Sequence, residues 1–110
     1  MTMTPGEMLT RLFDELIKQL SAFKEYNSQK DYAQANDALQ RAQRILRHLD
    51  ATLDRQYEVS HGLSALYDYF IRRTVEANRK DDAPIDEILP MVTELRDSFI
   101  QADRLARHGG

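Results

Sequence analysis

The chain has 110 residues, no cysteine and a formal net charge of −3, with acidic and basic residues interspersed along it. It therefore has no disulfide bridge or thiolate metal site, and it lacks the concentrated positive face of a nucleic-acid-binding protein. Because no apolar run approaches the roughly 18 residues of a membrane-spanning helix and residues 1–5 show no signal-peptide pattern, we expect a single cytoplasmic domain over residues 1–110, with no nucleic-acid partner and no membrane insertion.

The first predicted helix covers about residues 5–27. Thr4 and Glu7 have the spacing of a capping box, and Pro5 occupies the first helical position, where its missing N–H costs nothing. The polar stretch over residues 27–30 ends the helix. Apolar residues at helical spacing define its predicted buried face, which comprises Leu9, Leu12, Phe13, Leu16, Leu20 and Phe23.

The second predicted helix covers about residues 32–55, and Asp31 is its expected cap. Its apolar residues follow a pattern close to a heptad repeat, which is typical of a bundle seam. The first half of this stripe has small side chains, which leave room for another element to approach closely. The stripe comprises Ala35, Ala38, Leu39, Ala42, Ile45, Leu46, Leu49 and Leu53.

The third predicted helix covers about residues 61–79, and its stripe comprises Leu63, Leu66, Tyr67, Phe70 and Ile71. The fourth covers about residues 85–106, with Ile85, Ile88, Leu89, Val92, Leu95, Phe99 and Ala102 on one face. Pro90 lies inside this last pattern. Because proline removes a hydrogen bond and clashes with the preceding turn, we expect either a kink over residues 86–90 or a helix that begins later.

The connections between these four helices are short, so consecutive helices are expected to lie antiparallel. The sequence therefore predicts an all-α fold, an antiparallel up-down-up-down four-helix bundle.

Catalytic and cofactor chemistry has little support in the sequence. There is no cysteine and no serine in a glycine-rich turn, so we expect no enzyme activity. The Glu-x-x-His spacing of di-iron bundles occurs at Glu58 and His61, in a predicted turn. Met8 and His108 have roughly the arrangement of haem ligands in some bundle cytochromes. We expect no cofactor and no metal, and keep a haem- or metal-binding bundle as an alternative class.

Aromatic residues on the third helix indicate binding instead. Tyr67 and Tyr69 lie roughly 200° apart around a helix, so they cannot both face the core. Tyrosine offers contact area together with a polar group, which suits a surface that accepts a partner helix. Tyr69 is therefore either a partly exposed aromatic or a partner contact.

Several segments resemble the FliS family of flagellin chaperones. Residues 66–78 read LYDYFIRRTVEAN, which is similar to the family signature L-Y-D-Y-M-x-R-R-L-x-E-A-N. Residues 94–99, ELRDSF, are similar to the family's E-L-R-D-x-W, and residues 4–9, TPGEML, to its S-P-E-E-L start. The resemblance covers about residues 4–102, in the family's order and with spacing near that of the family.

This resemblance implies an antiparallel helical bundle in the bacterial cytoplasm. Such a chaperone binds the C-terminal segment of flagellin, which is disordered before it joins the filament, and prevents premature polymerisation. It then delivers flagellin to the flagellar type III export apparatus, whose gate includes the membrane protein FlhA. An adaptor bundle for another secretion substrate is the alternative. The oligomeric state of the chain is left open.

We expect the flagellin segment to bind along the small-sided stripe of the second helix and the exposed flank of the third. Core packing is the competing role for these residues, above all for Leu46 and Phe70. Charge reversal at Arg73 is expected to weaken flagellin binding and to leave the fold intact. The expected binding residues are Ala35, Ala38, Leu39, Ala42, Leu46, Tyr69, Phe70 and Arg73.

Overall fold

A computed structural model describes the backbone of residues 2–108 and the side chains of residues 2–106. Within that range the chain forms four α-helices and no strand, which confirms the predicted all-α class. The helices are α1 (Pro5–Ser28), α2 (Tyr32–Ala51), α3 (Glu58–Ala77) and α4 (Ala83–His108).

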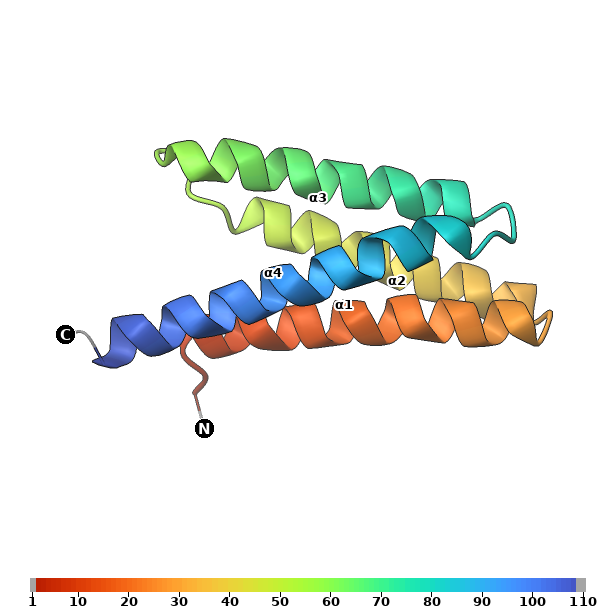
Figure 1. Ribbon diagram of the computed structural model, residues 1–110, viewed down its shortest axis with the longest axis horizontal. Coiled ribbons are helices and arrows are strands. Elements are labelled where there is room, and N and C mark those ends of the chain that lie inside the picture. The colour runs from red at the N-terminus through yellow and green to blue at the C-terminus, as the bar shows by residue number, and fades with distance from the viewer. Residues whose placement is uncertain (1, 109–110) are drawn as a thin grey trace.

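The four helices alternate in direction along the long axis of the molecule (Figure 1). Each helix packs against the next one in the chain, and α4 returns to pack against α1. Among the described residues, the backbones of the diagonal pairs, α1 with α3 and α2 with α4, do not approach as closely. The predicted antiparallel up-down-up-down bundle is therefore confirmed.

The predicted caps of α1 and α2 are both present. The Thr4 hydroxyl accepts a hydrogen bond from the Glu7 amide at 3.2 Å, and Pro5 follows at the first helical position. The Asp31 carboxylate accepts from the Gln34 amide at 3.3 Å. These bonds satisfy amide groups that have no partner inside the helix, so short polar residues fix where the two helices begin.

The turn between α2 and α3 differs from the prediction. α2 ends at Ala51 rather than near residue 55, because the Thr52 hydroxyl donates to the Leu49 carbonyl at 2.7 Å in the last turn. The Asp54 carboxylate then accepts from the Gln56 amide at 3.0 Å and closes a separate turn. α3 begins at Glu58, three residues earlier than predicted.

The alternative of a late start for α4 is wrong. The helix begins at Ala83, whose amide donates to the Asp81 carboxylate at 3.0 Å. Pro84 lies in the first turn, where a missing N–H is tolerated. Pro90 lies inside an uninterrupted helix and is exposed. Because proline has no N–H, the Asp86 carbonyl, four residues earlier, receives no hydrogen bond from residue 90. Asp86 is exposed, so water can bind this carbonyl instead.

All four helices contribute to one core. Buried apolar side chains include Phe13, Leu16 and Leu20 of α1, Leu39 and Leu46 of α2, Tyr67 and Phe70 of α3, and Ile85, Ile88 and Val92 of α4. Thr74, at a position where the FliS signature has leucine, is also buried, and its hydroxyl donates to the Ile71 carbonyl at 2.6 Å. The polar replacement is therefore satisfied within its own helix.

Candidate partner-binding surface

The apolar stripe of α3 loses its cover toward the start of the helix. Phe70, Leu66, Leu63 and Val59 follow one another at spacings of three or four residues, so they lie on the same face. Phe70 is fully buried, Leu66 and Leu63 are half-buried, and Val59 is 68% exposed. The inward-facing stripe therefore continues beyond the part of the bundle that covers it.

The stripes of α1 and α4 show the same gradient. In α4, Val92 is buried, Leu95 and Phe99 are half-buried, and Ala102 is exposed. In α1, Leu16 is buried whereas Leu9 and Leu12, nearer the amino terminus, are half-buried; Leu53, just after α2, is half-buried too.

Because the helices are antiparallel, these uncovered stretches meet at the same end of the bundle. Figure 1 shows that α2 and α3 lie apart from α1 and α4 at this end, whereas the four helices are close together at the other. Phe99 stacks on Phe13 with ring centroids 5.5 Å apart, which holds α4 on α1. We call this region the open end, and it comprises Leu9, Leu12, Val59, Leu63, Leu66, Leu95 and Phe99.

An end lined by half-buried leucine, valine and phenylalanine side chains has a defined binding chemistry. It can gain free energy by covering apolar surface, at about 25 cal/mol per Å². An amphipathic helix placed along it would offer apolar side chains every three or four residues. The arrangement suits a partner segment rather than a small polar molecule.

Six of the eight expected binding residues belong to the core instead. Each is at most 3% exposed, so a partner cannot reach it in this structure. The small side chains of α2 leave room as predicted, but neighbouring helices of the same chain fill that room, since α2 packs between α1 and α3. These buried residues are Ala35, Ala38, Leu39, Ala42, Leu46 and Phe70.

Tyr69 and Arg73 are partly exposed and take part in an ionic cluster between α3 and α4. The Tyr69 hydroxyl donates to Glu87, and the Arg73 guanidinium lies between Glu76 and Glu87. The Arg73 side chain is only 22% exposed, and its Nε atom is buried with no hydrogen-bond partner among the described residues. Reversing the charge of Arg73 would leave a third carboxylate beside Glu76 and Glu87, so we no longer expect that change to spare the fold.

The cluster predicts acid sensitivity. The hydrogen bond from Tyr69, aided by Arg73, lowers the pKa of Glu87 below its ordinary value of 4.5. A carboxyl whose pKa is lower in the folded state stabilises that state above pH 4.5, and this contribution is lost as the pH falls through the folded-state pKa. In Glu87→Gln, stability measured by urea unfolding is expected to fall less steeply below pH 4.5. Glu94→Gln is the control, because the Glu94 carboxylate has no ion pair among the described residues. Its free energy of unfolding should change with pH as steeply as that of the parent.

The residues considered for metal or haem do not gather. No group of three or more histidine, cysteine or acidic side chains among the described residues is arranged to hold a metal ion. Met8 is 49% exposed, and the side chain of His108 lies outside the described residues. Within the same described part of the chain, no helix is both long and apolar enough to cross a bilayer.

Val59 is the exposed apolar residue of the open end that the sequence analysis did not identify, because it was placed in a turn. Its spacing of four from Leu63, on a helix that begins three residues early, is the signal that could have found it.

Comparisons with known proteins give a consistent result. The family model of the flagellar protein FliS matches residues 1–106. The flagellar secretion chaperone FliS of Bacillus subtilis (strain 168) is 37% identical over 112 residues, which cover 98% of this chain and 84% of that protein. The flagellar secretion chaperone FliS of Salmonella typhimurium (strain LT2) is 31% identical over 105 residues, which cover 92% and 78%.

Proposed function

The chain belongs to the FliS family of flagellar proteins, and from this membership we propose that it is a cytoplasmic export chaperone for flagellin. It holds the disordered C-terminal segment of flagellin, prevents premature polymerisation and delivers flagellin to the type III export apparatus, with FlhA as a possible contact at the gate. It acts by binding and carries out no reaction.

The observation that supports this proposal is the open end. The same apolar stripes that form the core at one end of the bundle are half-buried or exposed at the other. Val59, Leu63 and Leu66 lie in the first half of α3 and Leu95 and Phe99 in the second half of α4, so the antiparallel order places them toward the same end of the bundle. An amphipathic segment that covers both would complete a core that the chain alone leaves unfinished.

Holding and release require a moderate affinity. A segment that is disordered when free must become ordered on binding, which costs about 2–5 kcal/mol of the interaction energy. Burial of an apolar face can therefore be extensive while the complex still dissociates at the export gate. While bound, the apolar face of the segment is unavailable to other copies of flagellin.

The test is a titration of the full chain with a flagellin C-terminal segment. Calorimetry measures the binding, and far-UV circular dichroism measures the change in helix content. The expected result is saturable one-to-one binding with a gain of helix beyond the sum of the two components. The control is a scrambled segment of the same composition, which loses the amphipathic pattern and should not bind. Absence of binding at tens of micromolar, with the bundle folded, would contradict the proposal and favour an adaptor for another secretion substrate.

A further inference from the structure

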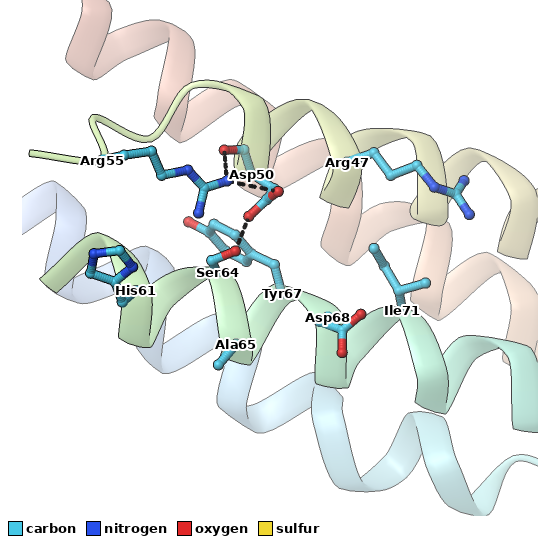
Figure 2. Close-up of a pocket in the computed structure, with 9 residues that line it drawn as sticks. All are labelled: Arg47, Asp50, Arg55, His61, Ser64, Ala65, Tyr67, Asp68 and Ile71. Carbon is cyan, nitrogen blue, oxygen red and sulfur yellow. Dashed lines mark hydrogen bonds and ion pairs between the residues drawn. The ribbon is translucent and has the colours of Figure 1, made fainter. Parts of the chain in front are cut away.

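A cleft of about 390 Å³ lies between the second half of α2, the turn after it and the first half of α3 (Figure 2). It is on a different flank of α3 from the open end, since Ser64 and Asp68 face it whereas Leu63 and Leu66 face the core. A segment bound along α3 can therefore contact both regions.

The floor of this cleft contains a hydroxyl without a partner. The Tyr67 side chain is 1% exposed and lines the cleft. Its hydroxyl makes no hydrogen bond with any described residue. Burial, together with the charge of Asp50, raises the pKa of Tyr67 to about 12, so the group remains a neutral donor at physiological pH. A ligand that supplies an acceptor would form a hydrogen bond with this donor and gain binding free energy from it.

The anions that face the cleft are already paired. The Asp50 carboxylate accepts from the Ser64 hydroxyl at 2.6 Å and from Arg55 Nη2 at 3.1 Å. Figure 2 shows these two bonds, with the Tyr67 ring directed toward the same part of the cleft. The Asp68 carboxylate pairs with Arg72 at 3.3 Å.

Positive charge is left over at the cleft. Arg47 lines it and has no ion-pair partner among the described residues. The exposed His61 side chain, which can offer an N–H donor, lies at the end near the turn. Arg55 donates from Nη2 to the carboxylate and to the backbone carbonyl of Asp50, and it retains the N–H groups of Nε and Nη1. An anionic acceptor would meet the unpaired charge of Arg47 together with N–H and O–H donors.

We propose that this cleft is a carboxylate-binding subsite, in which the Tyr67 hydroxyl and the Arg55 guanidinium donate to an aspartate or glutamate side chain of the bound partner segment. The proposal rests on the proposed function for its partner and extends it to the chemistry that the partner must carry. Ala65 and Ile71 line the cleft before and after Tyr67 along α3. They offer apolar contacts on both sides of the donor, which favours a side chain within the segment over a chain terminus.

The first test removes the donor. Tyr67→Phe keeps the buried ring and deletes the hydroxyl, and it is expected to raise the Kd of the flagellin segment roughly tenfold, because a hydrogen bond to a charged group is lost. Tyr26→Phe, which deletes a hydroxyl from the α1–α2 groove, is the matched control and should stay within about twofold. Circular dichroism of both variants verifies the fold. Equal affinity of Tyr67→Phe and the parent would overturn the proposal.

The second test identifies the acceptor. Acidic residues of the segment are changed singly to the corresponding amides and titrated against the parent and Tyr67→Phe. One such change is expected to weaken binding to the parent and to have little further effect on Tyr67→Phe, since the two groups act as a pair. Amidation of the segment's C terminus should have no effect; a tenfold loss on amidation would overturn the assignment to a side chain.

A third measurement does not depend on flagellin. The full chain, labelled with nitrogen-15, is titrated with N-acetylglutamate amide and separately with N-acetylglutamine amide. Only the charged probe is expected to shift the backbone amides of Arg55, Ser64 and Tyr67. Identical shifts with both probes, or none, would contradict the subsite even if flagellin binds. Binding of the charged probe without binding of flagellin would instead retain the subsite and reject the partner.

Discussion

Phe70→Ala is expected to lower the free energy of unfolding by about 3–5 kcal/mol, which is the usual cost of truncating a fully buried phenylalanine to alanine. Phe70 is 0% exposed, and its ring lies 6.2 Å from that of Tyr69, so its removal takes away apolar contacts and leaves a cavity between the helices. Since the free energy of unfolding of a small domain is only about 5–15 kcal/mol, this single change removes a large fraction of it.

The measurement is urea unfolding of the full chain followed by far-UV circular dichroism. Val75→Ala, on the same helix at a side chain that is 55% exposed, is the control and should change stability by no more than about 0.5 kcal/mol. The result also decides between two roles for Phe70. If it were an exposed contact for flagellin, as the sequence pattern allowed, truncation would reduce flagellin binding and leave the unfolding transition in place.

Val59→Asp is expected to weaken binding of the flagellin segment by about 2 kcal/mol or more, roughly a thirtyfold rise in Kd. Val59 lies on the stripe of Leu63 and Leu66 and is 68% exposed, so it is the outermost apolar contact that the open end offers on α3. A carboxylate there would have to lose its water to meet an apolar partner helix, and the side chains that define the open end are all apolar, so they could not compensate its charge.

The fold of Val59→Asp should be retained, because the side chain is exposed and an acidic group in the first turn interacts favourably with the helix dipole. Val75→Asp is the matched control: the same substitution, on the same helix, at a valine outside the open end. Titration calorimetry with the flagellin segment compares the two. Equal weakening by both changes would show that the open end is not where the segment binds.

The sequence was sufficient for features that depend on neighbours along the chain. Thr4 and Asp31 cap the helices that they were expected to cap, because a short polar side chain bonds to an amide only three residues away. Apolar spacing identified the buried faces, since a helix places every third or fourth residue on one side whatever it packs against. The FliS signature in residues 66–78 pointed to the family that the comparisons confirm.

The structure was needed for what lies between helices. A stripe of small residues on α2 predicts that another element approaches closely, but it does not identify that element. Here neighbouring helices of the same chain occupy the space in which a partner was expected. Likewise, Tyr69 and Arg73 looked like free contacts until the fold brought Glu87 from α4 beside them. Periodicity shows which face of a helix is apolar, whereas the burial of that face depends on which other elements pack against it.

The sequence by itself determined four amphipathic helices, their antiparallel order and the family, because each follows from local spacing, short connections or a contiguous motif. Only the tertiary structure decided where the apolar stripes are left uncovered. Leu63 and Phe70 belong to the same stripe of α3, yet one is half-buried and the other is fully buried. The difference arises from the separation of α2 and α3 from α1 and α4 at the open end, which is a property of how the helices pack and not of any one of them.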